Sequence, residues 1–113
     1  MERVDQHRHV LKQILTEKAE LFNRGTPSDI ETVLTFDEKR DTYMLLRLGW
    51  TAQGRLFVPT LYARLQGGKI WIENDWTEEG LATNLLEYGI PAEDVVLAFH
   101  PPEVRPHTEF AVA

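Results

Sequence analysis

The middle of this chain carries four segments in which apolar and polar residues alternate, and a short turn follows each of the first three. These segments are residues 30–36, 42–50, 55–66 and 69–74. Alternation with a period of two is typical of a β-strand, and short turns join strands that run in opposite directions. The sequence therefore predicts a four-stranded antiparallel meander, and this restricts the chain to folds built around such a sheet.

The turns and one proline refine this prediction. Gly67 and Gly68 form a two-residue connection that accepts positive φ angles, which is a strong hairpin signal. Residues 37–41 form a short charged loop between the first two strands. Pro59 has no N–H to donate to a neighbouring strand, so we expect a sheet edge or a β-bulge at this point of the third strand.

A first helix is predicted at residues 3–22, because apolar residues recur there at three-, four- and seven-residue steps. Its apolar stripe consists of Val4, Leu11, Ile14, Leu15, Ala19 and Phe22. The sequence Gly25-Thr26-Pro27 supplies the stop. Val10 and Leu21 widen the stripe. Packing on the domain's own sheet is the leading explanation for it, and a stripe shared in a homodimer is the second.

A second helix is predicted at residues 76–88. Asp75 at the N-cap position and Glu78 three residues later fit a capping box, with Thr77 as the competing cap. Gly89 then ends the helix in the left-handed conformation.

The rest of the chain completes the fold class. A short turn at residues 92–94 leads into an apolar strand at residues 95–99. After His100 two prolines forbid regular pairing, and residues 108–113 are expected to add a last short strand or to dock as an extended tail. The predicted class is α+β: an N-terminal helix, a four-stranded antiparallel meander, a second helix, a C-terminal strand and an irregular tail.

Composition bounds the kind of protein. A length of 113 residues and a hydrophobic content of 42% predict one globular domain over residues 1–113. The absence of cysteine excludes a thiolate nucleophile and Cys-ligated zinc. No charged and apolar leader opens the chain and no apolar run is long enough to span a membrane, so we expect a cytoplasmic protein that makes no membrane contact.

Charge argues against autonomous DNA binding. Acidic residues outnumber basic residues by 18 to 12, which gives a formal net charge of −6, and a negative field repels phosphate backbones. The first helix is where nucleic-acid contacts would be sought, through Arg3, Arg8 and Lys12, with Lys18 beyond them. These residues do not share one face, and a solvated helix face explains them more simply.

Asp75, Glu78 and His100 are the residues from which a small hydrolase would be built. The chain is poor in nucleophiles, because it has no cysteine and Ser28 is its only serine. Helix capping accounts for the acids, and a structural hydrogen bond to the following turn accounts for His100. We therefore expect no catalytic residue, no metal site and no cofactor.

Two further groups of residues admit more than one interpretation. Trp50, Trp71 and Trp76 suggest a stacking platform for bases, but few basic residues are interleaved with them. Packing in the core or in an interface is favoured, with Trp76 the most exposed of the three. Arg105 can clamp an anion or a partner's carboxylate, or it can pair internally with one of two nearby glutamates, and the internal pair is favoured.

Many short motifs recur here in a characteristic order. They are Tyr43, Leu45, Leu46, Gly49 and Trp50; Lys69-Ile70-Trp71-Ile72; Asp75, Thr77-Glu78, Gly80 and Ala82; Gly89-Ile90-Pro91; Asp94-Val95-Val96-Leu97; and His100, Pro102, Arg105, Thr108, Phe110 and Ala113. Over essentially its full length the chain thus resembles the XisI family, the fdxN element excision-controlling factors of cyanobacteria. It departs from the family at Trp76, where many relatives have glycine, and its first motif is one residue shorter than expected.

The resemblance implies a non-enzymatic accessory factor for the site-specific excision of a DNA element. Such a factor would act by binding a partner protein, XisH, within a recombinase complex, and the family brings no catalytic residues. The candidate partner-binding residues are Trp76, Glu78, His100, Arg105 and His107. Direct DNA binding through the first helix and the small hydrolase remain the alternatives. A homo-oligomer formed through the first helix and the third strand is a separate prediction.

Overall fold

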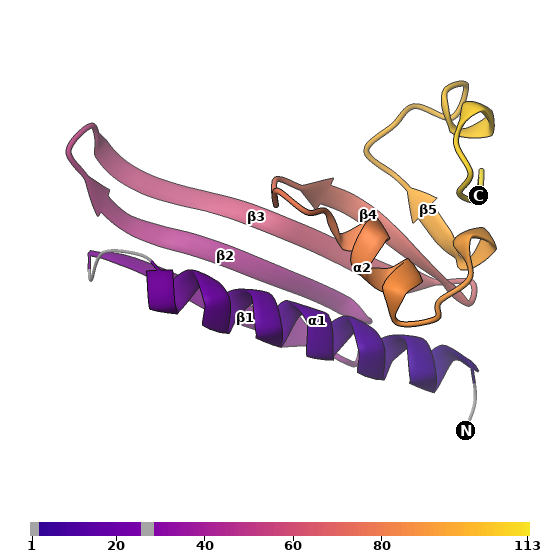
Figure 1. Ribbon diagram of the computed structural model, residues 1–113, viewed down its shortest axis with the longest axis horizontal. Coiled ribbons are helices and arrows are strands. Elements are labelled where there is room, and N and C mark those ends of the chain that lie inside the picture. Colours follow the sequence, from indigo (N-terminus) through magenta and orange to yellow (C-terminus); the bar gives the residue numbers. More distant parts are fainter. Residues whose placement is uncertain (1–2, 26–28) are drawn as a thin grey trace.

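The computed structural model describes residues 3–25 and 29–113. In chain order the elements are α1 (Arg3–Gly25), β1 (Ile30–Asp37), β2 (Thr42–Thr51), β3 (Gly54–Gln66), β4 (Lys69–Asp75), α2 (Leu81–Glu87), η1 (Ala92–Asp94), β5 (Val95–Leu97) and η2 (Arg105–His107), the η elements being single 3₁₀ turns. The α+β class is confirmed (Figure 1). The predicted stop of the first helix was Gly25-Thr26-Pro27. Gly25 is the last residue of α1, and Thr26 and Pro27 lie outside the described residues.

All five strands form one sheet in the order β1-β2-β3-β4-β5. The first four strands are joined by short turns and pair antiparallel, so the predicted meander is confirmed. β5 pairs with β4 in parallel, because the chain crosses over through α2 before it returns to the sheet. The sheet as a whole is therefore mixed.

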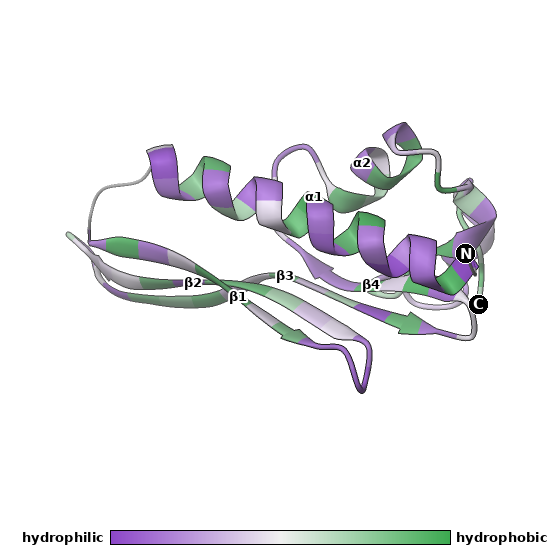
Figure 2. Cartoon of the chain, turned by 90° about the horizontal axis from the view of Figure 1, so that it is seen from below, coloured by the Kyte–Doolittle hydropathy of each residue, from purple (hydrophilic) through white to green (hydrophobic). Residues whose placement is uncertain are grey.

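Both α-helices cover the same face of the sheet, and the core lies between them and that face (Figure 2). The core cluster includes Val10, Leu11, Ile14, Leu15 and Ala19 of α1, and Tyr43, Leu45, Leu61, Ile70 and Ile72 of the sheet. Each fully buried Leu or Ile contributes about 1.5–3 kcal/mol of transfer free energy. Packing on the chain's own sheet therefore accounts for the stripe of α1 except at Leu21, which is exposed. Within residues 3–25 and 29–113, no helix combines the length and the apolar character needed to cross a membrane.

The second helix is shorter than predicted, since it begins at Leu81 rather than at residue 76. Its N-cap is Gly80, with a φ of 87°, and the intervening residues form a loop. The predicted capping box of Asp75 with Glu78 is wrong. Instead, one carboxylate oxygen of Asp75 accepts the backbone N–H of Thr77 at 2.9 Å, and the other accepts that of Leu81 at 2.6 Å. The carboxylate of Asp75 therefore connects the two ends of this loop, and it satisfies the backbone N–H of Leu81 in the first turn of α2.

A β-bulge in β3 holds this loop in place. The pairing of β3 with β2 shifts between Pro59 and Leu61, which leaves Thr60 as an extra residue, so the bulge predicted at Pro59 is confirmed. The carbonyl oxygen of Thr60 accepts the backbone N–H of Trp76 at 2.8 Å. The loop therefore starts against the middle of β3.

Both edges of the sheet are partly occupied from within the chain. On the free side of β1, the side-chain amide of Asn23 donates to the carbonyl of Thr32 and accepts its N–H. β5 ends at Leu97, two residues earlier than predicted, and the tail beyond it forms a single bridge between Val96 and Ala111. The tail thus bends at residues 108–110, docks on β5 through this one bridge and adds no further strand.

Asp41, in the turn between β1 and β2, connects α1 to the sheet. Its carboxylate accepts Nε of Arg8 at 2.8 Å, Nη2 of Arg8 at 3.1 Å and the hydroxyl of Tyr43 at 2.7 Å. Its carbonyl accepts the N–H of Leu65 at 2.9 Å. The hydrogen bonds from Arg8 hold the pKa of Asp41 below its usual range, while burial raises the pKa of the Tyr43 hydroxyl.

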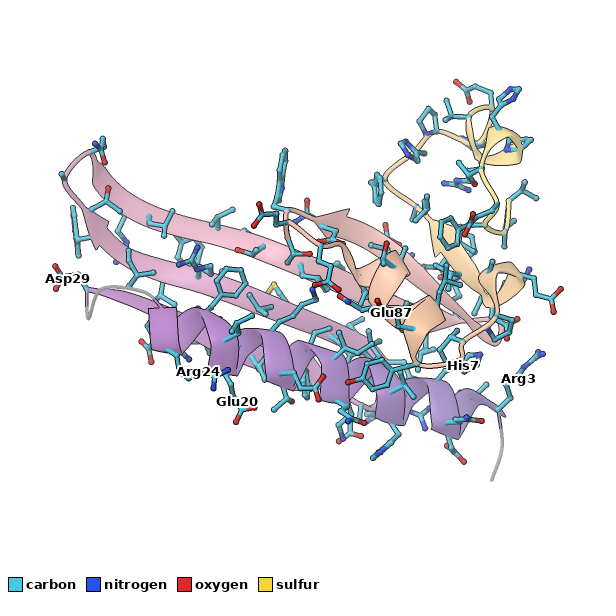
Figure 3. The ribbon with its side chains drawn as sticks, in the orientation of Figure 1. Arg3, His7, Glu20, Arg24, Asp29 and Glu87 are labelled. Carbon is cyan, nitrogen blue, oxygen red and sulfur yellow. The ribbon has the colours of Figure 1, made fainter. Side chains whose placement is uncertain are left out.

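A buried polar pair fixes the same N-terminal part of α1 to the segment before β5. Nε2 of His7 lies 2.9 Å from Oδ2 of Asp94, both residues are almost fully buried, and Nε of Arg3 lies 3.7 Å from the same oxygen. Figure 3 shows His7 and Arg3 at this N-terminal end of the helix. The pair joins residues 87 positions apart, and no spacing rule in the sequence reveals it.

Gly49 permits no side chain. Its φ is 148°, and a Cβ there would lie 1.9 Å from the carbonyl oxygen of Asp29. We expect Gly49→Ala to lower the free energy of unfolding by more than about 2 kcal/mol, because the backbone must move. Gly54→Ala is the matched control, since its φ is 123° but no atom lies within 4 Å of a Cβ there. Equal losses for the two variants in urea denaturation would show that the contact with Asp29 is unimportant.

The charge of Asp41 should give stability that acid removes. We expect Asp41→Asn to be less stable by about 1–3 kcal/mol at neutral pH, because Arg8 loses a charged acceptor. Asparagine tolerates the φ of 53° at this position, so the change tests the charge and not the backbone. Since the pKa of Asp41 is lower in the folded state than in the unfolded chain, its contribution is present above the unfolded pKa of about 3.9 and is lost as pH falls through the folded pKa.

Urea denaturation of both proteins at a series of pH values measures this contribution. The difference in unfolding free energy should stay constant down to about pH 5 and then close as the solution becomes more acidic. A difference that persists unchanged in acid would contradict the assignment.

Candidate functional site

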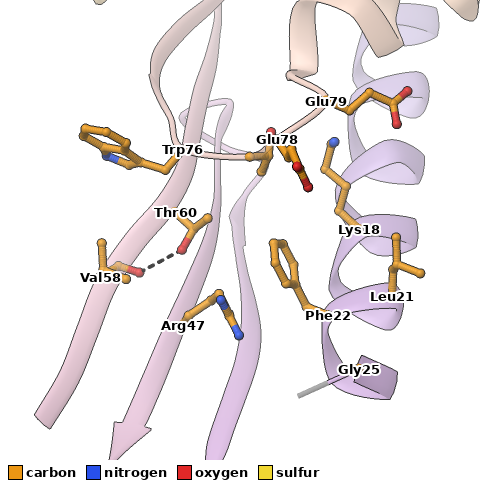
Figure 4. A pocket seen from close by; sticks show the side chains of 11 residues that line it. Lys18, Leu21, Phe22, Gly25, Arg47, Val58, Thr60, Trp76, Glu78 and Glu79 are labelled. Atoms are coloured by element: carbon orange, nitrogen blue, oxygen red, sulfur yellow. Dashed lines mark hydrogen bonds between the residues drawn. The ribbon is translucent and has the colours of Figure 1, made fainter. Parts of the chain in front are cut away.

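An open cleft of about 800 Å³ lies between the C-terminal half of α1, the sheet and the loop after β4 (Figure 4). Its principal side chains are Lys18, Leu21 and Phe22 from α1, Arg47, Val58 and Thr60 from the sheet, and Trp76, Glu78 and Glu79 from the loop. The volume falls within the range of about 300–1,000 Å³ that is usual for ligand sites. The hydrogen bond from Trp76 to the bulge at Thr60 gives the cleft its loop wall.

Arg47 lies in this cleft with unused hydrogen-bonding capacity. Its guanidinium carbon is 4.5 Å from the centroid of the Phe22 ring, which is a cation–π contact. Nε of Arg47 is buried and has no acceptor among the described residues. Arg47 is also absent from every ion pair formed in residues 3–25 and 29–113. The cleft thus holds a positioned cation that no residue of the described part of the chain neutralises.

The walls around Arg47 are mainly apolar, and two of their side chains are largely exposed. Trp76 is 75% exposed and Leu21 is 64% exposed, while Phe22 and Val58 are half-buried. The prediction that Trp76 is the most exposed tryptophan is confirmed. An apolar surface that solvent reaches in this way is available for contact with another molecule.

The charged groups at the rim differ between the two sides of the cleft. Lys18 stands on α1, whereas Glu78 and Glu79 stand on the loop. Oε1 of Glu79 accepts the side-chain amide of Asn84 at 2.8 Å. Glu78 is exposed and forms no ion pair with the described residues. Of the predicted partner-binding residues, the structure therefore brings Trp76 and Glu78 together here.

Arg105 has a different place, in the C-terminal tail. Its Nε donates to the carbonyl of His100 at 3.0 Å, and its Nη1 donates to the carbonyl of Val112 at 3.1 Å. The guanidinium also lies over the ring of Trp71, 5.7 Å from the centroid. The predicted internal pair with a neighbouring glutamate is wrong. The guanidinium N–H groups of Arg105 donate instead to main-chain carbonyls, and these bonds connect two parts of the C-terminal tail.

His100 and His107 also lie in the tail, outside the lining of the cleft. The carbonyl of His100 accepts Nε of Arg105 from the following turn, and its N–H donates to the carbonyl of Leu97 at 3.1 Å. Its ring contacts that of Phe99 in a tilted arrangement, at a centroid distance of 4.6 Å. His107 is exposed on η2. These two residues and Arg105 stay predictions as partner contacts, now on a separate surface from Trp76 and Glu78.

The three predicted nucleic-acid contacts of α1 are all engaged with carboxylates. The pairs are Arg3 with Asp94 at 3.7 Å, Arg8 with Asp5 at 2.6 Å and with Asp41 at 2.8 Å, and Lys12 with Glu38 at 2.9 Å. A phosphate would have to compete with these acids. Arg3, Arg8 and Lys12 therefore offer little free positive charge to DNA, whereas Lys18 on the same helix forms no ion pair with the described residues.

The residues of the predicted hydrolase do not form a site. Both carboxylate oxygens of Asp75 accept hydrogen bonds within its own loop, and neither Asp75 nor His100 lines the cleft that Glu78 borders. Within the described residues, no group of three or more His, Asp or Glu side chains is placed to hold a metal ion. The geometry gives this alternative no support.

The sheet face turned away from the helices carries a second apolar surface. Trp50 and Phe57 are 62% and 61% exposed near the turn between β2 and β3, and the guanidinium of Arg55 lies 5.6 and 5.9 Å from their ring centroids. The core alternative for Trp50 is therefore wrong, and the interface alternative remains. Phe57 belongs to the third strand, and the predicted homo-oligomer through the first helix and the third strand stays a prediction.

Sequence reasoning missed Arg47 and Phe22 as parts of a site. A signal existed for Arg47, because strand alternation places it on the same face as Tyr43 and Leu45, which are both fully buried. A charged residue on a core-facing row is rare unless it has a partner or a function. Phe22 offered no such signal, since it belongs to the regular stripe of α1.

The described residues thus form a two-layer α+β domain with an open, mainly apolar cleft between α1, the sheet and the loop after β4. The sequence profile of the XisI protein family matches residues 1–112, and the chain therefore belongs to the XisI family. The resemblance predicted from the motifs is thereby confirmed. A comparison with curated proteins found no match.

Solved structures agree with this membership. The fdxN element excision controlling factor XisI from Anabaena variabilis ATCC 29413 is 38% identical, with a TM-score of 0.84 over 99% of this chain and 100% of that one. A XisI-like protein from the same organism is 28% identical, with a TM-score of 0.89 over 97% of this chain and 99% of that one. Both share the fold described above.

Arg105 should determine how firmly the tail is held. We expect Arg105→Met to raise the exchange rate of the Ala111 amide, which donates to Val95, by about tenfold, because the tail loses charged donors to its carbonyls. Arg24→Met, in the exposed last turn of α1, is the control for loss of one positive charge. Hydrogen exchange followed by NMR measures both variants, and unchanged protection of Ala111 in the first would refute this role.

Proposed function

We propose that this protein is a non-enzymatic controlling factor for the site-specific excision of a DNA element. It would act in the cytoplasm by binding a XisH-like protein and, through it, a recombinase complex. Membership of the XisI family supports the process, as does the 38% identical relative that is named an fdxN element excision controlling factor. The XisH-like partner follows from the family resemblance.

The observation that carries the proposal is the exposed Trp76 at the rim of an apolar cleft. Tryptophan is the residue most enriched among those that dominate binding energy at protein interfaces, and such residues sit beside pockets that exclude water. A net charge of −6 suits contact with a protein better than contact with a phosphate backbone.

The other two functions lack a supporting observation. Direct DNA binding through Arg3, Arg8 and Lys12 would need cations that already serve carboxylates of the same chain. A hydrolase would need Asp75, whose oxygens are committed to its loop. Recognition of a protein partner is the function for which the described surface is suited.

Loss of Trp76 should weaken the partner complex. We expect Trp76→Ala to reduce the affinity for the XisH-like partner by about tenfold or more, because a central aromatic contact is removed. Trp50→Ala is the matched control, since it removes an exposed tryptophan from the other face of the sheet. Biolayer interferometry with the purified partner measures both.

Two results would contradict this prediction in different ways. A loss of affinity in Trp50→Ala alone would place the contact on the open sheet face. Failure of the wild-type protein to bind the partner at micromolar concentrations would contradict the proposed function itself.

A further inference from the structure

We propose that the cleft beside α1 binds a peptide segment in which an acidic side chain stands next to an apolar one, and that Arg47 receives the acidic group. This inference rests on the proposed function, because it names the contact by which a protein partner is held. It assigns the cleft an occupant of defined chemistry and gives Arg47 the specificity-determining role.

The first argument is that two buried polar side chains, Arg47 and Thr32, lack hydrogen-bond partners among the described residues. Arg47 pairs with Thr32 on β1 and with Val58 on β3, so neither lateral neighbour carries a charge. Nε of Arg47 and the hydroxyl of Thr32 are both buried without a partner in the described residues. Buried polar groups nearly always have a hydrogen-bond partner, so this position is one where a ligand that brings a polar group is favoured.

The second argument is the orientation of Arg47. Its guanidinium is held against the Phe22 ring at 4.5 Å, which restricts the rotation of a long side chain before anything binds. A guanidinium fixed in this way presents a planar set of donors that matches the two oxygens of a carboxylate. Less entropy is then lost when the carboxylate arrives.

The third argument concerns what surrounds the charge. Phe22, Leu21, Val58 and Trp76 give the cleft apolar walls beside Arg47, and these walls suit an aliphatic or aromatic side chain that is adjacent to the acid. Lys18 adds a second cation on the helix side. An acidic residue beside an apolar one satisfies both features at once.

The distribution of charge favours a carboxylate over a phosphate. Glu78 and Glu79 border the same cleft on the loop side. A phosphate group carries a charge of about −1.5 to −2 at neutral pH and would be repelled more strongly by these acids than a single carboxylate would be. A basic side chain further along the peptide would meet Glu78 favourably.

The first experiment measures the affinity of the XisH-like partner for three variants. Arg47→Met keeps an unbranched, flexible side chain at this position but removes the guanidinium donors that face Phe22. Val58→Glu places a carboxylate opposite Arg47 in the sheet, so it supplies an internal acceptor and blocks the site while the cation is kept. Arg24→Met is the control, because Arg24 lies on the exposed side of α1 (Figure 3).

We expect both cleft variants to lose affinity by about tenfold or more and the control to keep it, since truncating one member of a charged contact removes at least this much. Thermal unfolding followed by circular dichroism checks that each variant is folded. Val58→Glu keeps the test decisive if Arg47→Met does not fold.

The second experiment needs no natural partner. The ¹⁵N-labelled protein is titrated with the peptide acetyl-Ala-Glu-Leu-Phe-Ala-amide, with the same peptide carrying Gln in place of Glu, and with inorganic phosphate. We expect the Glu peptide alone to shift the amide signals of Phe22, Arg47 and Val58, and these shifts to vanish in Arg47→Met. Equal shifts with the Gln peptide, or the same shifts with phosphate, would overturn the inference.

The two experiments separate the inference from the function on which it rests. If the partner binds the wild-type protein and both cleft variants equally well, the inference is wrong and the proposed function stands. If the partner binds no form of the protein, the proposed function fails. Shifts with the Glu peptide alone would then support the cleft as a peptide site in its own right.

Discussion

The structure depends on the burial of one face of one sheet, and α1 supplies most of that cover. A meander with water on both faces has no core, so the strands are stable only beneath the helix. Two polar contacts set where the helix lies: Arg8 on Asp41 and His7 on Asp94. The C-terminal half of the same helix then borders the cleft. The site is therefore a by-product of the way in which the core is covered.

Most of the fold could be predicted because its signals are local. Alternation, short turns and the helical stripe require no knowledge of distant residues, and the bulge at Pro59 follows from a missing N–H. The start of α2 could not be predicted in the same way. Asp75 carries a cap signal, but the carbonyl of Thr60 takes the N–H of Trp76 and draws the chain into a loop before the helix begins. A bond between distant segments overrides the local preference.

In the candidate site, too, contacts between sequence neighbours could be predicted and contacts between distant elements could not. Trp76 and Glu78 were predicted as partner contacts and do meet in one cleft, because they are neighbours on one loop. The importance of Arg47 depends on Phe22, which reaches it from another element. Arg105 was predicted to pair internally with a glutamate, and the structure gives it other partners. The guanidinium of Arg105 donates to main-chain carbonyls whose positions depend on the path of the tail. These acceptors could therefore not be predicted from the sequence.

The amide of Asn23 on the outer side of β1 has a consequence for assembly. The side-chain amide of Asn23 forms hydrogen bonds with both the N–H and the carbonyl of Thr32, so it occupies the place where a residue of an added strand would pair. The bridge from Ala111 obstructs the opposite border in a similar manner. Another chain that added a strand at either edge would first have to displace Asn23 or Ala111. Other molecules are thereby directed toward the broad surfaces of the domain, and fibre-like stacking of copies is discouraged.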